Sequence, residues 1–199
     1  MTKFSGRIRT NAAAAILIFL AVVISCKSAS DYSPFSTDET QKAGEMVTAA
    51  NKDLQEIKVL YEQNESMRRE LKQALETNNA EQVQDISERV IKLIADGTVI
   101  AKRAINTIGD ALDMNINDKY REYLELKKKS LERQLEAFQN YSVAAESLKK
   151  NYDPRDEEKR NAVKNEFKDL TEKYTADMER ARSLSYQANE LWQTLAQSE

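Results

Sequence analysis

Four long segments repeat apolar side chains at alternating steps of three and four residues, and this periodicity constrains the fold more than any other feature. The clearest repeat lies in the last segment, from Val163 to Leu195. Such steps place apolar side chains on one stripe of an α-helix, and that stripe must be buried against other helices. Only 4 glycines and 2 prolines occur among the 199 residues, so few positions can interrupt these helices.

The pattern predicts four helices joined by connections of two to four residues. Short connections force consecutive helices to run antiparallel. We therefore expect an all-α fold, an elongated up-down-up-down four-helix bundle with coiled-coil-like packing, about 50–60 Å long. The bundle occupies residues 38–199, and its predicted helices are 38–77, 80–114, 118–151 and 154–197.

Polar residues between the helices predict where each helix begins. Asn79 is placed to cap the second helix, and the turn 114–118 contains a cap for the third. Asp153-Pro154 is expected to end the third helix and to start the fourth. Gly97, inside the second helix, indicates either a kink or a close approach of another helix, and its position on the apolar stripe favours close packing.

The absence of histidine and the single cysteine exclude most familiar catalytic and metal sites. No disulfide can form within the chain, and Cys/His zinc sites, His-based acid–base chemistry and ferritin-like di-iron sites are unavailable. No carboxylate pair is marked out for hydrolysis, and the few short loops offer little to build a cleft. We expect no metal, no cofactor and no enzymatic activity.

The charge balance argues against a nucleic-acid partner. The formal net charge is −3, and without the three basic residues of 1–25 it becomes −6, with 27 basic residues against 33 acidic ones. Phosphate recognition needs a basic patch, which this sequence lacks.

The N-terminus has the three parts of an export signal. Lys3, Arg7 and Arg9 precede an uninterrupted apolar run over 12–24, and Ser25-Cys26 follows. A helix of 13 residues rises about 20 Å, whereas the hydrocarbon core of a bilayer is about 30 Å thick. The run therefore favours the middle region of a secretory signal over a spanning anchor.

The residues that end this run, Val23-Ile24-Ser25-Cys26, resemble the lipobox of bacterial lipoproteins. The resemblance covers the first 27 residues and implies cleavage between Ser25 and Cys26, diacylglyceryl transfer to the Cys26 thiol and acylation of the new amino group. Residues 1–25 are then a signal peptide, and 26–37 are the lipidated cysteine with a flexible tether. Lys27, rather than Asp, after the cysteine implies the outer membrane more than the inner one. The alternative is an incidental cysteine beside an ordinary cleavage site.

Three polar residues on the apolar stripes form a candidate buried cluster. Asn64 and Arg68 face inward on the first helix, and Asp177 lies on the stripe of the last. If they meet, they form a ligand-binding or register-setting contact. Alternatively the stripes rotate locally, with Met67 and Met178 inward and the polar residues at the edge. The tyrosines of the helices either line a pocket or, more commonly, lie at the core boundary with the hydroxyl in water.

These features predict a membrane-tethered, extracytoplasmic lipoprotein that acts as a non-catalytic binding or scaffold module of the bacterial cell envelope. Its expected partners are the membrane, through the lipid anchor, and another envelope protein or a second copy of the chain. The alternative is a small-molecule sensor that resembles the four-helix periplasmic domains of chemoreceptors.

Overall fold

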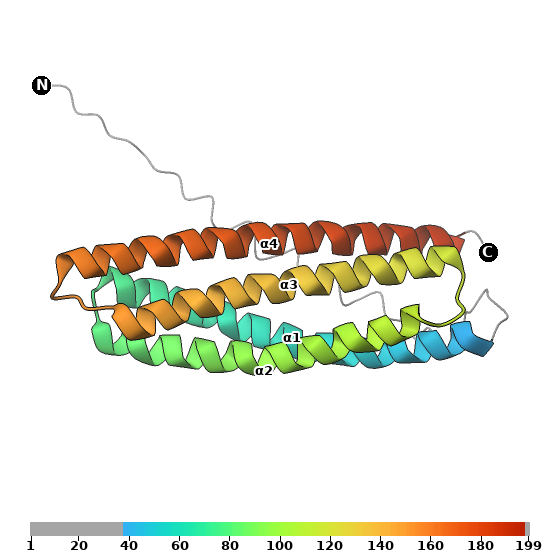
Figure 1. The fold of residues 1–199 in the computed structure, drawn as a ribbon, viewed down its shortest axis with the longest axis horizontal. Coiled ribbons are helices and arrows are strands. Elements are labelled where there is room, and N and C mark those ends of the chain that lie inside the picture. The colour runs from blue at the N-terminus through green and yellow to red at the C-terminus, as the bar shows by residue number, and fades with distance from the viewer. Residues whose placement is uncertain (1–37, 198–199) are drawn as a thin grey trace, which may run out of the picture.

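The computed structural model describes residues 38–197, which form four helices connected by short turns. Their order is α1 (Asp38–Glu76), α2 (Ala80–Leu112), α3 (Asp118–Asn151) and α4 (Glu157–Gln197). The helices lie side by side and alternate in direction, so the α1–α2 and α3–α4 turns share one end and the α2–α3 turn lies at the other (Figure 1). The predicted all-α four-helix bundle is confirmed, and the described residues contain no strand.

Residues 1–37 and 198–199 lie outside the described part of the chain. The predicted signal peptide, the tether and Cys26 are therefore outside it as well. Among the helices within 38–197, none has both the length and the apolar content that crossing a bilayer would require.

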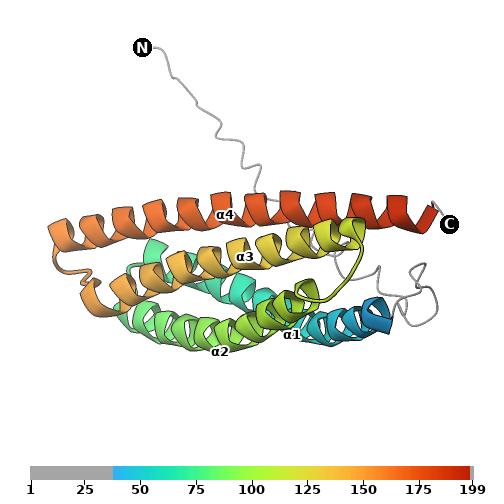
Figure 2. The same cartoon turned by 45° about the vertical axis from the view of Figure 1, so that its right-hand side comes forward.

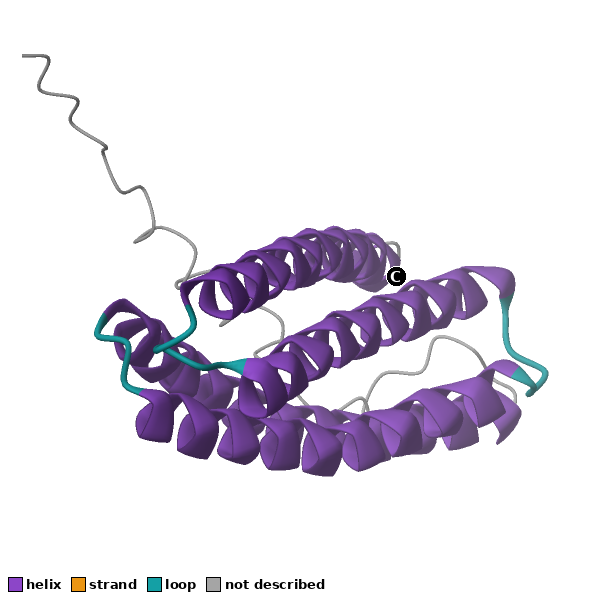
Figure 3. Ribbon diagram, turned by 60° about the vertical axis from the view of Figure 1, so that its left-hand side comes forward, coloured by secondary structure: helices purple, strands orange, loops and turns teal. Residues whose placement is uncertain are grey.

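The helices that a turn connects pack closely, but the first and last helices do not. The pairs α1–α2, α2–α3 and α3–α4 are in close contact, whereas no Cα atom of α1 comes within 8 Å of a Cα atom of α4 in the described chain. Figures 2 and 3 show the bundle from two other sides, and in Figure 2 α3 lies between α4 and α2. The wider α1–α4 side of the bundle needs long side chains to span it.

The core consists of two clusters of buried apolar side chains, one toward each end. The cluster near the α1–α2 and α3–α4 turns includes Leu71, Val90 and Leu148, all fully buried. The cluster near the α2–α3 turn includes Ile108 and Leu124, also fully buried. Burial of such side chains contributes roughly 1.5–3 kcal/mol each, so the two clusters supply most of the driving force for folding.

The predicted caps of the second and third helices are present. The Asn79 carboxamide oxygen accepts a hydrogen bond from the Gln82 amide at 3.1 Å, and Asn117 accepts one from the Tyr120 amide at 2.8 Å. Asn78, just before the first cap, has a φ of 53°. Asparagine tolerates this left-handed conformation better than most residues, which lets the α1–α2 turn be short.

The start of the last helix differs from the prediction, since α4 begins at Glu157 and not at residue 154. The Asp153 carboxylate accepts a hydrogen bond from the Arg155 amide at 3.0 Å, which holds 153–155 in a turn instead of starting a helix. Asp156 is the cap, because its carboxylate accepts from the Lys159 amide at 3.1 Å. Two other helices end slightly early, α1 at Glu76 and α2 at Leu112.

Gly97 marks a close approach of helices, as favoured above. The α2 helix continues unbroken through this residue, so there is no helix break. A Cβ atom added at Gly97 would lie 3.4 Å from the Leu60 Cδ1 atom of α1. The missing side chain therefore leaves room for Leu60 at the α1–α2 contact.

Replacement of the Asp156 cap should destabilise the protein in a pH-dependent way. The hydrogen bond from the Lys159 amide lowers the pKa of Asp156, so its contribution is present above the unfolded pKa of about 3.9 and is lost as the pH falls through the lower folded value. We expect Asp156→Ala to lower the melting temperature at pH 7, and the difference from wild type to shrink below about pH 4. Asp156→Asn keeps a capping oxygen and should remain close to wild type at pH 7. Thermal unfolding followed by circular dichroism tests this, and equal losses in both variants would contradict it.

Candidate functional site

The structure does not bring the three predicted polar residues into one cluster. Asn64 lines a cavity between α1, α2 and α3, whereas Arg68 lies against aromatic rings of α3 and α4. Asp177 lies elsewhere, where its carboxylate accepts a hydrogen bond from Asn140 of α3 at 3.1 Å and pairs with Arg180 at 3.3 Å. The predicted contact between Asp177 and Arg68 is therefore replaced by two separate polar sites on α1 and one on α4.

Local rotation of the apolar stripe explains the position of Asp177 but not that of Asn64. On α4, Met178 is buried and Asp177 lies at the edge, as the alternative predicted. On α1 the reverse holds, because Asn64 is only 1% exposed while Met67 is partly buried beside the core. Asn64 is therefore an interior polar residue.

The Arg68 site bridges the wide side of the bundle between α1 and α4. The Arg68 guanidinium pairs with the Glu65 carboxylate at 2.6 Å, and its Cζ atom lies 4.6 Å from the centre of the Tyr174 ring and 5.4 Å from that of Tyr141. The Tyr174 hydroxyl also donates to Glu65, at 3.4 Å. A cation over two aromatic rings is a favourable contact, so this site holds together helices whose backbones are far apart.

Lys164 gives the same side a second bridge near the α1–α2 turn. Its ammonium group donates to the Leu75 carbonyl at 2.8 Å and to the Asn78 side chain at 2.9 Å. Burial lowers the pKa of Lys164, with a further contribution from Arg160 nearby. Long cationic side chains of α1 and α4 thus span the side where apolar side chains alone do not bring the helices together.

Aromatic rings surround Arg68 and connect three helices. Ring centres in this group are 5.3–6.2 Å apart, in tilted or edge-on arrangements that suit aromatic contacts. Tyr141 is fully buried and Tyr174 is 2% exposed, so the expectation of hydroxyls in water is wrong for these two. Burial raises the pKa of both hydroxyls, which keeps them protonated at neutral pH. The rings of the group belong to Tyr61, Phe138, Tyr141, Phe167 and Tyr174.

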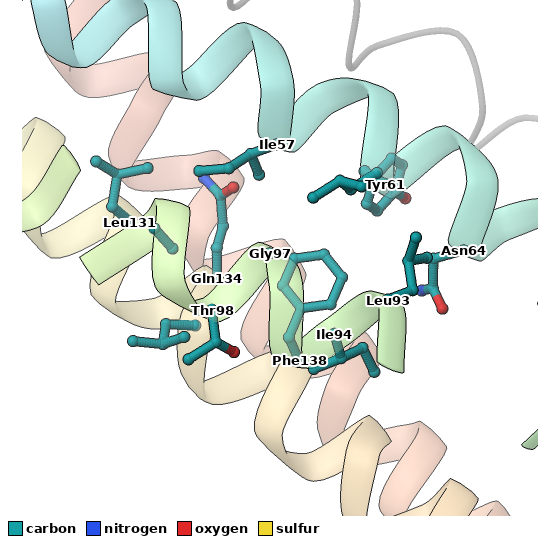
Figure 4. A pocket seen from close by; sticks show the side chains of 13 residues that line it. Ile57, Tyr61, Asn64, Leu93, Ile94, Gly97, Thr98, Leu131, Gln134 and Phe138 are labelled. Carbon is teal, nitrogen blue, oxygen red and sulfur yellow. The ribbon is translucent and has the colours of Figure 1, made fainter. Parts of the chain in front are cut away.

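The cavity beside Asn64 lies between α1, α2 and α3, where the two core clusters meet (Figure 4). Its volume is about 30 Å³, enough for one or two water molecules. Four of the residues around it are polar, Tyr61, Asn64, Thr98 and Gln134, but the surface that faces the cavity is almost entirely apolar. The remaining wall is apolar and includes Ile57, Leu60, Leu93, Ile94, Leu131 and Phe138.

Three unfavourable features coincide at this cavity. Neither polar atom of the Asn64 carboxamide has a hydrogen-bond partner among residues 38–197, at a cost of about 1–3 kcal/mol for each buried group. Gly97 in the wall costs about 1 kcal/mol in helix propensity relative to Ala, and a void of this size costs about 0.7 kcal/mol. Natural sequences place such conflicts mainly at functional sites, so we treat the cavity as a candidate site.

A larger, open groove of about 830 Å³ lies at the end of the bundle opposite the α2–α3 turn. It lies between the start of α2 and the α3–α4 turn, and its cationic residues are Lys150, Arg155 and Lys159. Each of these is already paired with a carboxylate of the chain: Glu146, Asp153 and Asp156, respectively. The groove is therefore close to neutral and does not select an anionic ligand.

The described residues offer no group of three or more Cys, Asp or Glu side chains placed to hold a metal ion. Glu65, the carboxylate of the Arg68 site, is paired with the Arg68 guanidinium. That guanidinium lies over aromatic rings of α3 and α4. Sequence reasoning found Asn64 and Arg68 but missed Glu65 and Tyr174. The only available signal was the i, i+3 spacing of Glu65 and Arg68 on one helix.

Comparisons with protein-family models, with curated proteins and with solved structures found no match to this chain.

Removal of Glu65 should destabilise the bundle more than removal of Arg68. Glu65→Ala leaves a largely enclosed guanidinium without its carboxylate, and we expect a loss of about 1–3 kcal/mol in the free energy of unfolding. Arg68→Met keeps the apolar contact with the rings and should cost less, and the double variant should lose less than the sum of the two. Urea unfolding measures all three.

Glu62→Ala is the matched control, because Glu62 is 65% exposed and its pair with Lys58 is long, at 3.9 Å. It should change the free energy of unfolding by less than about 0.5 kcal/mol. A loss in Glu65→Ala no larger than in this control would show that the Arg68 site does not hold α1 and α4 together.

Proposed function

We propose that the protein is a membrane-tethered extracytoplasmic lipoprotein whose helical bundle is a non-catalytic binding or scaffold module of the bacterial cell envelope. The observation that carries the binding role is the filled interior. The cavity at Asn64, at about 30 Å³, is too small for a metabolite, and the Arg68 site is occupied by the chain's own side chains. The outer surface of the bundle is then the place where a partner would bind.

The proposed location rests on the N-terminal sequence. The apolar run that ends at Val23-Ile24-Ser25-Cys26 resembles a lipoprotein signal, and several acyl chains, at about 0.8 kcal/mol per buried methylene, would hold such a domain at a membrane. Lys27 after the cysteine favours the outer membrane over the inner one.

The shape of the bundle suits a spacer between a membrane and a partner. The chain enters at Asp38, at the end that holds the α2–α3 turn, and α1 carries it 39 residues, about 58 Å, to the other end (Figure 1). A lipid anchor ahead of Asp38 would place the α1–α2 and α3–α4 turns farthest from the bilayer. The open groove of about 830 Å³ lies at that far end, where a partner has access.

The exposed surface of the bundle is better suited to a polar contact than to an apolar one. The large apolar residues that are exposed lie on four different helices and are Val59, Val99, Val143 and Tyr186. Many exposed ion pairs join residues three or four apart on the same helix, and such pairs exchange partners at little cost. We therefore favour a partner protein with a polar, charged interface over self-association through an apolar strip.

The second candidate function is a small-molecule sensor, and the buried carboxamide of Asn64 is the observation that favours it. The cavity volume limits this role, since sensor bundles bind metabolite-sized molecules between helices. A sensor tethered only by lipid would also need a partner to carry its signal across the membrane.

Substitution of Cys26 tests the proposed anchor. Cys26→Ser should abolish labelling by radioactive or alkyne-tagged fatty acid, and should move the protein from the membrane pellet to the soluble fraction, because the thiol is the acceptor of the diacylglyceryl group. Ser28→Ala, two residues away, is the control and should behave as wild type. If the Cys26→Ser protein stays in the pellet, the lipoprotein assignment is wrong.

Crosslinking in envelopes tests the scaffold role. Mild crosslinking, detergent solubilisation and affinity purification of the wild-type chain should recover one defined envelope protein in stoichiometric amount. Crosslinks placed by mass spectrometry should concentrate near the α1–α2 and α3–α4 turns. Recovery of the uncrosslinked monomer alone, at crosslinker levels that capture a known envelope complex, would contradict the role.

A further inference from the structure

The contact between α1 and α4 differs in kind from the contacts inside the two helical hairpins. Among the described residues, no Cα atom of α1 lies within 8 Å of a Cα atom of α4. The α1–α2 and α3–α4 pairs each share a turn and pack with their backbones close together (Figure 1). The bundle therefore consists of two hairpins whose backbones approach each other closely only where α2 packs against α3.

We propose that the bundle opens on its wide side, where the α1–α2 and α3–α4 hairpins separate as intact units about the α2–α3 turn. The bridges made by Arg68 and Lys164 hold this side closed. The proposal concerns the bundle alone, so it does not depend on the lipid anchor or on the scaffold role.

The α3–α4 hairpin is joined by buried contacts that such a separation leaves intact. The Ser130 hydroxyl of α3 donates to the Ala181 carbonyl of α4 at 2.8 Å, and both residues are buried. Farther along the hairpin, the centres of the Tyr141 and Tyr174 rings lie 5.3 Å apart. Within the described residues, the ring pairs that involve α4 have their partner on α3. The aromatic contacts of α4 therefore hold it to α3.

The α1–α2 hairpin is also tied internally. The Arg103 guanidinium of α2 donates two hydrogen bonds to the Asp53 carboxylate of α1, at 2.9 and 2.5 Å, and Asp53 is buried. Paired hydrogen bonds between arginine and a carboxylate are among the stronger polar contacts in proteins. The Glu39 carboxylate of α1 accepts a hydrogen bond from the Asn115 amide at 2.7 Å, which holds the start of α1 to the turn that follows α2.

The polar bridges of the wide side leave no charge without a partner when the hairpins separate. Arg68 and Glu65 both belong to α1, so their ion pair at 2.6 Å moves with that helix. The Tyr174 hydroxyl of α4 loses its contacts with Tyr61 and Glu65 of α1, the second of which is long, at 3.4 Å. Lys164 loses its two oxygen acceptors near the α1–α2 turn. Water replaces these partners, so the net cost of breaking each bridge is small.

Apolar burial limits how often the open form occurs. Both core clusters contain side chains of α1 and of α4, such as Leu75 with Tyr174 and Ala50 with Ala188. Separation exposes these side chains to water, so the closed bundle is the major form. Urea weakens apolar burial and therefore raises the population of the open form before the hairpins themselves unfold.

Distances between paired spin labels, measured by double electron–electron resonance in rising urea, test the proposal. Exposed residues on three helices provide the label sites, Val59 of α1, Val143 of α3 and Tyr186 of α4, in a Cys26→Ser chain that has no other thiol. The pair Val59→Cys with Tyr186→Cys should show a second, longer distance at urea concentrations where circular dichroism still reports full helicity. The pair Val143→Cys with Tyr186→Cys, inside the α3–α4 hairpin, should keep its single distance there.

Removal of a bridging cation should make the wide side open more readily. Lys164→Ala should bring the longer distance of the Val59 and Tyr186 pair to lower urea concentrations, because the bridge to the end of α1 is lost. Lys168→Ala, one turn later on α4, is the matched control. Lys168 is 72% exposed and pairs within α4 with Glu172, so its removal should leave the urea dependence of the opening unchanged.

Loss of the native distance in both label pairs only where helicity also falls would overturn the proposal, because the bundle would then unfold in one step. Lengthening of the Val143 and Tyr186 pair before the Val59 and Tyr186 pair would overturn it as well, as would equal effects of Lys164→Ala and Lys168→Ala. If Lys164→Ala does not fold, the two label pairs in the chain that keeps Lys164 still decide the question.

Discussion

The architecture depends on burying the apolar stripe of each helix under the constraint of very short connections. Helices of 33 to 41 residues are joined by three to five residues, so each helix must return alongside the one before it. The three pairs that share a turn are held close by that constraint, and the α3–α4 pair packs aromatic rings such as those of Tyr141 and Tyr174. The α1–α4 pair shares no turn, and its backbones stay more than 8 Å apart throughout the described chain.

The environments of the interior polar residues follow from this unequal spacing of the helix pairs. On the wide side, an arginine can lie flat over aromatic rings and keep its carboxylate partner, because there is space for a long side chain. On the other side of α1, toward α2 and α3, only a small cavity lies next to Asn64. Two polar positions one turn apart on α1 therefore have unlike environments. Arg68 is paired with Glu65, whereas Asn64 has no hydrogen-bond partner in the part of the chain that the structure describes.

The proposed membrane role and the proposed binding role rest on different parts of the chain. The membrane role depends on the residues up to Cys26, which lie outside the described part of the chain. The binding role depends on the bundle, whose interior is filled by its own side chains and whose far end offers an open groove. A filled, highly charged rod suits the proposed role of a spacer or docking element.

Apolar periodicity, the cap at Asn79 and the scarcity of glycine and proline were sufficient to determine the four helices, their antiparallel order and most of their ends, because these depend on contacts within a few residues. The start of α4 was misplaced because Asp153 and Asp156 are both competent caps, and only the turn held by Arg155 decides between them. Which polar residues meet was decided by tertiary structure. The distance between α1 and α4 and the rotation of each stripe set those contacts, and both depend on how all four helices pack together.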